Sequence, residues 1–456
     1  MALQAPRPVG GHNRYTMTLP EPSDSRAPSL AEPGRDRFRL PADARLIDSR
    51  FAAWRLAAAL IASTLGSAPM YVLAVVLPEI QRDFDIGRGE AALAYTVTMI
   101  GLGAGGYLCG RWADRWGVAR VLALGGLGTL AGFLLAAAAP NLVVFALAHC
   151  LLLGFLGMGS TFAPLVADTA LWWQRRRGVA VAVVASGNFL AGTVWPPVVQ
   201  AGIEAFGWRL TFSALGVVCG LGVWVLSLCM RQMPPRVTNS IGSALAASAH
   251  GSDRPFGLSP LSAQWLLFFA AVCCCVAMAM PQVHIVAYCT DLGFSAARGA
   301  EMLSLMLGFG VVSRLASGWI SDQIGGLRTL LLGSVLQAVA LVLFLPFDSL
   351  GSLYVISAMF GLFQGGIFPA YAIIVREYFP PEQVGARTGG VLVGGQVGMA
   401  LGGWLSGKVF DLTGSYDAAF LNGIAWNLVN LAIGIWLLWR IRPRRPSRLV
   451  ASPGAL

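Results

Sequence analysis

The sequence predicts an all-α protein that crosses a membrane many times. Only 12% of the 456 residues are charged and 56% are hydrophobic, whereas charged residues make up roughly a quarter of a soluble globular protein. Apolar runs of about 20 residues recur along the chain, the length that an α-helix needs to cross the ~30 Å hydrocarbon core of a bilayer. Ten-residue runs that alternate apolar and polar residues, as a membrane β-barrel requires, are absent.

Twelve segments are apolar enough to be spanning helices. They are expected at about 56–78, 91–110, 119–139, 142–167, 178–203 and 209–230, and then at 264–289, 299–320, 328–346, 351–375, 387–410 and 417–440. This order predicts two six-helix halves, residues 51–231 and 261–441. A cytoplasmic linker over 232–260, rich in Ser, Ala and Gly, joins them. A disordered N-terminal tail over 1–50 and a C-terminal tail over 442–456 complete the chain.

The placement of arginine predicts the orientation in the membrane. Lys408 is the only lysine, and arginines gather before the first span, after the second and fourth spans, and after the last. Because loops on the cytoplasmic side are enriched in Arg and Lys, both termini are expected to be cytoplasmic, in a bacterial-type inner membrane. The net charge of +10 therefore lies in loops and tails and does not indicate a nucleic-acid partner.

The two halves repeat. GRWADRWGVAR begins at Gly110 and GWISDQIGGLR begins at Gly318, and four matching residues recur at an offset of 208. Such a repeat is typical of a transporter built by parallel duplication.

The first copy of the repeat resembles the motif G-x-x-x-D-R/K-x-G-x-x-R of the major facilitator superfamily. That resemblance implies two six-helix halves and a conformational latch between them, in which glycine allows close helix approach and aspartate meets the positive end of a helix dipole. The alternative is that these aspartates and arginines are plain loop charges that set the topology of the chain in the membrane. The residues assigned to the latch are Gly110, Asp114, Arg115, Gly117, Arg120, Gly318, Asp322, Gly325 and Arg328.

One arginine lies too deep to be a loop charge. Arg314, in LMLGFGVVSRLASGWISD, stands eight residues before Asp322, about 12 Å along a helix axis. The equivalent position in the first repeat, 208 residues earlier, is Gly106. The repeated scaffold therefore does not require an arginine at this position. Placing arginine at such a depth costs roughly 2.5–3.5 kcal/mol, and its fork suits a carboxylate or phosphate. The alternative is a structural ion pair, but no Asp or Glu lies securely inside a predicted span.

Two further segments resemble monocarboxylate transporters and their oxalate/formate-exchanging relatives. They are LWWQRRRGVAVAVVASGNFL, with small residues Gly178, Ala182 and Ser186 at helical spacing, and VHIVAYCTDLGFS followed by the arginine. The resemblance implies that Arg314 binds a substrate carboxylate beside His284. Gly310 stands where many animal members have an aspartate, which leaves His284 as the candidate proton carrier. In the eleventh span neutral Gln396 stands where oxalate-type relatives have a lysine, and one buried cation rather than two favours a monoanion.

Other polar or aromatic residues fall within spans that could border a cavity. Pro281 is expected to break or bend the seventh helix near His284, which would place the histidine beside a cavity. The alternative is that His284 merely lies near the outer surface. Ordinary helix contacts are the alternative for the remaining candidates. The predicted substrate-binding residues are Arg314, His284, Phe162, Asn188, Gln364, Tyr371 and Gln396.

These features predict a secondary transporter that moves a small carboxylate, most simply a monocarboxylate, by alternating access, either with or without proton coupling. The alternatives are an exporter or exchanger of another organic anion or amphipathic metabolite, and a non-transporting membrane sensor. The expected partners are a small organic anion, protons and bilayer lipid, with the protein acting as a monomer. Neither an enzyme activity nor a cofactor is expected. No metal site is expected either, because the consecutive Cys273, Cys274 and Cys275 point in different directions on a helix.

Overall fold

The computed structural model describes residues 46–173, 175–232, 254–380 and 383–441. Most of the predicted tails and of the predicted linker lies outside this part of the chain. The described part is built from helices, which confirms the predicted fold class.

Six helical units make up the first half, several of them composed of consecutive segments. They are α1 (Arg50–Gly66) with α2 (Ala68–Phe84); α3 (Arg88–Trp116); α4 (Val118–Ala137); α5 (Leu142–Leu147), the π-helix η2 (Ala148–Met158), α6 (Gly159–Thr161) and α7 (Ala163–Trp172); α8 (Arg177–Ala185) with α9 (Gly187–Phe206); and α10 (Trp208–Leu215), the π-helix η3 (Gly216–Leu221) and α11 (Gly222–Cys229).

The second half repeats this plan after a short 3₁₀ turn, η4 (Pro255–Gly257). Its units are α13 (Pro260–Asp291), α14 (Ala296–Ile324), α15 (Gly326–Leu343), α16 (Leu350–Gln364) with α17 (Ile367–Tyr378), α18 (Val384–Thr413) and α19 (Tyr416–Ile441). Within the described residues, eleven units are long and apolar enough to cross a membrane. The 30-residue α18 takes the place of the predicted eleventh span, which gives the twelve helices that the sequence predicts.

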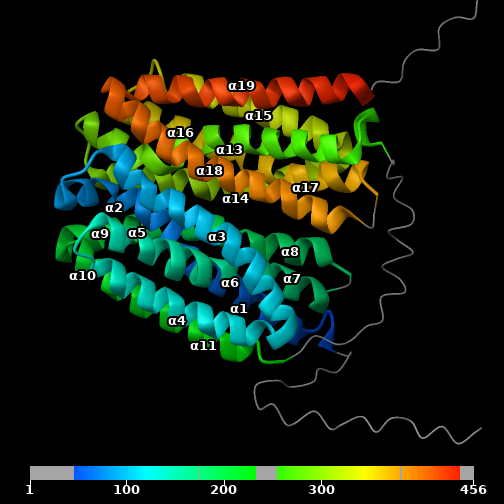
Figure 1. Cartoon of the computed structure of the whole chain (residues 1–456), viewed down its shortest axis with the longest axis horizontal. Helices are drawn as coiled ribbons and strands as arrows, with labels where there is room; N and C mark the ends of the chain where they lie inside the picture. The colour runs from blue at the N-terminus through cyan, green and yellow to red at the C-terminus, as the bar shows by residue number, and fades with distance from the viewer. Residues whose placement is uncertain (1–45, 174, 233–253, 381–382, 442–456) are drawn as a thin grey trace, which may run out of the picture. The chain divides into compact units, whose positions relative to one another are not determined.

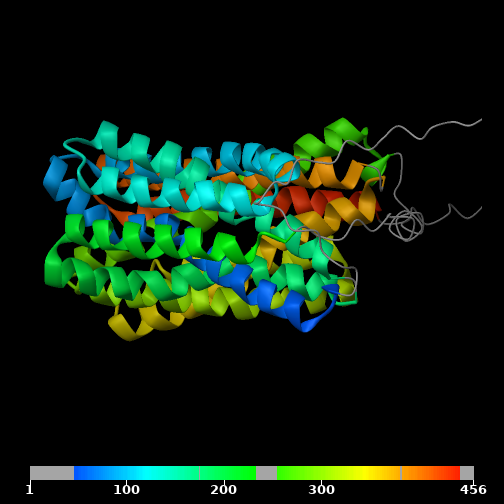
Figure 2. The same cartoon turned by 90° about the horizontal axis from the view of Figure 1, so that it is seen from below.

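The helices run roughly parallel, with α1–α11 on one side of the bundle and α13–α19 on the other (Figure 1). The view from below shows the same parallel packing (Figure 2). We call the end at which α1 and α13 begin and α11 and α19 end the terminal end, and the opposite one the far end. The turns after α3, α7 and α14 lie at the terminal end, because each follows an even number of crossings.

The internal repeat is reproduced in backbone geometry. Gly117 (φ 85°, ψ 150°) ends α3 and Gly325 (φ 83°, ψ 159°) ends α14, so both repeats turn in the same way. A side chain would strain this positive φ, which explains glycine at both positions. The close helix approach expected at Gly110 and Gly318 is absent in this structure, because a methyl group at either would meet no heavy atom within 4 Å. The side chain of Asp322 lies outside the described part.

Four units of the described chain are interrupted near their middle, a feature not predicted from the sequence. The interruptions are at Ser67, Phe162, Ser186 and Gly365–Gly366. Pro69 and Pro164 stand in the first turns of α2 and α7, and Pro369 in that of α17, where proline's missing N–H has no helical partner to lose. Pro281, by contrast, does not break α13, which is continuous from Pro260 to Asp291. Spanning helices tolerate proline where neighbouring groups satisfy the freed carbonyl.

Among the described residues one carboxylate is buried inside the bundle, contrary to the expectation that none would be. Asp168 belongs to α7, which continues five residues past the predicted end of its span at 167. Its Oδ2 accepts hydrogen bonds from Nη2 and Nε of Arg55, at 2.8 and 3.1 Å, and the two side chains are 8% and 3% exposed. Arg55 belongs to α1, one residue before the predicted start of the first span at 56. The pair lies within the first half and leaves Arg314 without this partner.

The contact between α14 and α16 generates a prediction about stability. A methyl group at Gly361 would overlap the carbonyl oxygen of Met306, so Gly361→Ala should lower stability by about 1–3 kcal/mol through overpacking. The measurement is the thermal unfolding midpoint in detergent. Gly351→Ala on the same helix meets no heavy atom within 4 Å and should leave the midpoint unchanged or slightly higher. Equal midpoints for both variants would contradict the packing argument.

Candidate functional site

A cavity of about 1370 Å³ lies between the two halves. The first half contributes residues of α2, α3, η2, α7, α8 and α9, and the second half contributes residues of α13, α14, α16, α17 and α18. The lining continues to Gly325, Arg376 and Glu377 at the terminal end, where the two charged side chains are exposed. The cavity therefore opens at that end. All four helix interruptions border it, through Ser67, Phe162, Gly365 and the pair Ala185 and Asn188.

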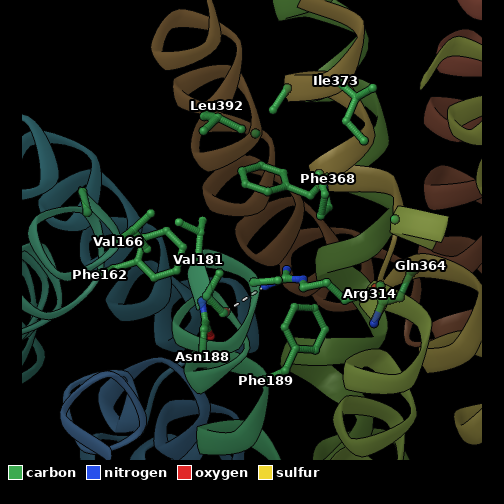
Figure 3. A pocket seen from close by; sticks show the side chains of 18 of the residues that line it. Phe162, Val166, Val181, Asn188, Phe189, Arg314, Gln364, Phe368, Ile373 and Leu392 are labelled. Carbon is green, nitrogen blue, oxygen red and sulfur yellow. Dashed lines mark hydrogen bonds between the residues drawn. The ribbon is translucent and has the colours of Figure 1, made fainter. Parts of the chain in front are cut away.

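Arg314 reaches from α14 across the cavity to the opposite half. Its Nη1 donates a hydrogen bond of 2.9 Å to the carbonyl oxygen of Ala185, the last residue of α8 (Figure 3). Its guanidinium carbon lies 4.1 Å from the centre of the Phe189 ring. The buried Nε has no hydrogen-bond partner among the described residues, and none of the described carboxylates forms an ion pair with Arg314. The arginine is held in place through Nη1, whereas the opposite edge of its fork has no hydrogen-bond partner among the described residues.

The space beside Gly310, four residues before Arg314, is occupied by the ring of Phe189 from the first half. A methyl group at Gly310 would overlap the ring of Phe189. The ring that supports the guanidinium therefore occupies the space that an aspartate at 310 would need. This contact gives a physical reason for glycine at a place where many animal monocarboxylate transporters carry an acid.

Two hydrogen-bonded pairs of neutral polar residues also line the cavity. The hydroxyl of Tyr71 donates to Oδ1 of Asn188 at 2.7 Å, and Nε2 of Gln282 is 3.0 Å from Oε1 of Gln364. Gln364 is fully buried, and its own Nε2 has no partner among the described residues. Two residues of the lining, Gln364 and Arg314, thus each hold a buried donor without a partner among the described residues, and Arg314 is the charged residue at the centre of the cavity.

The predicted site residues divide into two groups. Arg314, Phe162, Asn188, Gln364 and Gln396 line the cavity. Sequence reasoning missed Tyr71, Phe189, Gln282 and Phe368, which also line it. Phe189 adjoins Asn188 and Gln282 adjoins Pro281, but neighbouring residues on a helix point in different directions, so adjacency alone gave no signal.

His284 and Tyr371 lie outside the cavity lining. His284 is fully buried, with its Nε2 2.8 Å from the carbonyl oxygen of Gly403 on α18. Cys275, Met278 and Gln282 form the cavity face of α13, and a residue two positions after Gln282 is turned about 200° away from it. The hydroxyl of Tyr371 donates to Oδ1 of Asn430 at 2.8 Å, within the core of the second half. The structure therefore brings neither residue to Arg314.

The small residues at the start of the fifth unit also face the cavity. Gly178 and Ala182 line it, and a methyl group at Gly178 would meet no heavy atom within 4 Å. Together with Ser186 they do not form one continuous helical face, because α8 ends at Ala185 and the helix is interrupted at Ser186.

At the far end the two halves are joined by charged groups. Asp411 of α18 accepts hydrogen bonds from the backbone N–H groups of Arg88 (2.9 Å) and Gly89 (2.8 Å), the first residues of α3. The Arg88 guanidinium forms an ion pair with Asp291 of α13 and donates to the Tyr416 hydroxyl at 2.8 Å. A carboxylate at a helix N-terminus is favourable, so these contacts close the far end while the terminal end stays open.

No group of three or more His, Cys, Asp or Glu side chains in the described part of the chain is arranged to hold a metal ion.

Comparison with known proteins agrees with this architecture. The sequence model of the Major Facilitator Superfamily matches residues 59–352 and 302–453. Monocarboxylate transporter 13 of Bos taurus is 28% identical over 333 residues, 71% of this chain and 75% of that protein. The uncharacterized MFS-type transporter YcxA of Bacillus subtilis is 25% identical over 350 residues, 73% of this chain and 82% of that protein.

A solved structure shows the same fold. It is a bacterial homolog of the human lysosomal transporter Spinster in an inward-facing and occupied conformation, with a TM-score of 0.66 at 14% identity, covering 86% of this chain and 97% of that one. The family match spans most of the chain, and the fold, the repeat and the relatives agree with it. This chain is therefore a member of the Major Facilitator Superfamily.

Proposed function

We propose that this protein is a secondary active transporter that moves a small monocarboxylate across the cytoplasmic membrane by alternating access. The observation that carries the proposal is Arg314, an arginine in the cavity between the halves with no carboxylate partner among the described residues. Intramembrane charges of this kind mark substrate pathways. The relatives named as monocarboxylate transporters support the same substrate class.

The proposed binding mode follows from the free edge of the guanidinium. Nη1 is engaged by Ala185, so a carboxylate would accept two parallel hydrogen bonds from Nε and Nη2. The unpaired Nε2 of Gln364 supplies a further donor. One central cation is balanced by one negative charge, which favours a monoanion. The hydrogen bond between Arg314 and Ala185 also links the two halves, so an anion that draws the guanidinium away would loosen that link.

The open terminal end and the closed far end support alternating access. The distribution of arginine predicts that the terminal end is cytoplasmic, so this conformation would face inward. Rocking of the halves would break the far-end contacts of Arg88 and Asp411 and close the terminal end. Gly110 and Gly318 have open space around them at that end, as expected of latch residues that pack only in the other conformation.

The second candidate is the same transport mechanism with another organic anion or an amphipathic metabolite, which the many apolar residues of the cavity favour. A substrate panel separates the two, because only a carboxylate carrier is inhibited by carboxylates alone. A non-transporting sensor would bind without any uptake.

Replacement of Arg314 tests the proposal directly. Arg314→Gln should weaken carboxylate binding by about 30-fold or more, because it removes one partner of a buried charge pair. The measurement is uptake of labelled lactate, pyruvate, formate, oxalate and 3-phenylpropanoate into proteoliposomes. Arg82→Gln is the control, because Arg82 is an exposed arginine at the far end, 71% accessible. Uptake that survives in Arg314→Gln would place the anion site elsewhere.

Proton coupling is part of the proposal, with His284 as the candidate carrier. Because His284 contacts Gly403 and not the cavity, protonation would act on the α13–α18 contact rather than on the anion. His284→Gln should abolish accumulation driven by an inward proton gradient while exchange of carboxylate across the membrane continues. Counterflow and gradient-driven uptake are measured side by side. Gradient-driven accumulation by His284→Gln would exclude the histidine as the carrier.

The far-end contacts predict how the conformational balance shifts. Loss of a hydrogen bond to a charged group costs about 1.5–3 kcal/mol, so Arg88→Ala with Asp291→Asn should raise the far-end-open population about tenfold or more. The measurement is the distance distribution between spin labels at Arg82 and Leu412, with the partly exposed Cys150 and Cys229 replaced by serine. Both label sites are exposed and belong to different halves.

The control for this experiment removes a cation at the same end without touching the contact between the halves. Arg298 pairs with Glu301 inside the second half, so Arg298→Gln should leave the distances unchanged. An unaltered distribution in the Arg88/Asp291 variant would show that these contacts do not hold the far end closed.

A further inference from the structure

We infer that the transported monocarboxylate carries a bulky apolar body, aromatic or branched, rather than the one to three carbons of formate, lactate or pyruvate. The inference rests on the proposed function, because it takes Arg314 as the carboxylate site. It is carried by the arrangement of the cavity, which has hydrogen-bond donors at one end and apolar walls at the other.

The polar end is the floor of the cavity, nearest the far end of the bundle. Arg314, Asn188 and Gln364 gather there (Figure 3). Nε of Arg314 and Nε2 of Gln364 are both buried and unpartnered among the described residues, whereas Asn188 already accepts from Tyr71. An unpaired buried donor is unfavourable until it meets an acceptor. The floor is therefore suited to one carboxylate.

Above the floor, toward the terminal end, the lining becomes apolar on both sides. Phe162, Val166 and Val181 come from the first half (Figure 3). Phe368, Ile373 and Leu392 come from the second half and lie across the cavity from them (Figure 3). A short acid held at Arg314 would leave these side chains facing water. An aromatic ring or branched chain between the walls would remove that apolar surface from water and gain aromatic contacts.

The size of the cavity and the flexibility of its lining fit such a body. The volume of about 1370 Å³ exceeds the roughly 300–1,000 Å³ of typical small-molecule sites. Four methionines line it, Met70, Met158, Met278 and Met399. Methionine is unbranched and polarizable, so it adapts to apolar ligands of different shapes. The cavity can therefore adapt to more than one apolar body.

The charged residues of the lining do not provide a second anion site in the walls. Besides Arg314, the charged lining residues of the described chain are Arg376 and Glu377, both exposed at the rim. The Glu377 carboxylate accepts from the backbone N–H of Gly326, at 3.0 and 3.1 Å. A dicarboxylate would place its second charge against apolar side chains, which is unfavourable.

The test uses purified full-length protein and matched acids. Isothermal titration calorimetry measures binding of propanoate, 4-methylpentanoate and 3-phenylpropanoate, with 3-phenylpropanamide and phenylsuccinate as the uncharged and doubly charged analogues. We expect 3-phenylpropanoate to bind about tenfold or more tightly than propanoate. The amide and the dianion should each bind about tenfold or more weakly than 3-phenylpropanoate, and uptake into proteoliposomes should follow the same order.

Variants of the walls identify the surface responsible. Phe162→Ala and Phe368→Ala should remove most of the preference for 3-phenylpropanoate while propanoate affinity stays within about twofold. Gly395→Ala reaches the same wall without deleting a side chain, because its methyl group would overlap the Phe368 ring. Phe347→Ala, at an exposed phenylalanine outside the cavity lining, is the matched control. The thermal midpoint of each variant checks its folding.

The outcomes separate the two proposals. Equal affinities for propanoate and 3-phenylpropanoate, both lost in Arg314→Gln, would overturn the inference and leave the proposed function standing. A preference for 3-phenylpropanoate that both wall variants retain would also overturn it. Arg314-independent binding of every acid would overturn the proposed function and, with it, the inference.

Discussion

A polar group inside a bilayer has to find its partner within the protein, and this constraint governs the centre of the molecule. Non-helical backbone at membrane depth is tolerated only where protein or a cavity covers it. The interruptions at Ser67, Phe162, Ser186 and Gly365–Gly366 all border the cavity between the halves. Just before one of them, the carbonyl oxygen of Ala185 accepts the hydrogen bond of Arg314. The buried cation and the broken helix therefore satisfy each other.

Close helix packing places these groups. The backbone contact between Gly361 and Met306 sets the approach of α16 to α14, and so the spacing of Gln364 and Arg314. At the far end, a methyl group at Gly407 would lie 2.9 Å from the carbonyl oxygen of Arg88, which brings α18 against α3. That approach allows Asp411 to reach the first N–H groups of α3. Small residues thus fix both the geometry of the cavity and the closure of the far end.

The fold could be predicted because membrane spans are read from length and hydropathy, and because a repeat at a constant offset exposes the duplication. The repeat also made Arg314 stand out, because the equivalent residue of the first half is Gly106 and the shared scaffold therefore does not require an arginine there. The orientation of each side chain could not. His284 lies at a suitable depth but on the α18 face of α13, and Tyr371 adjoins the lining residue Ala372 yet points into the core. Asp168 was misjudged because its helix extends beyond the apolar run.

The two halves share a scaffold but differ in chemistry, and this asymmetry bears on how binding and movement are coupled. The second half supplies the cation, the unpaired amide of Gln364 and the Phe368 wall, whereas the first half supplies Phe189 and the carbonyl oxygen of Ala185. A proposed carboxylate on the Nε–Nη2 edge would share the guanidinium with that carbonyl group, which accepts from Nη1. A shift of the guanidinium toward the anion would lengthen this hydrogen bond and weaken the link between the halves at the floor. Anion binding would then favour loosening of the floor, which is the coupling that alternating access requires.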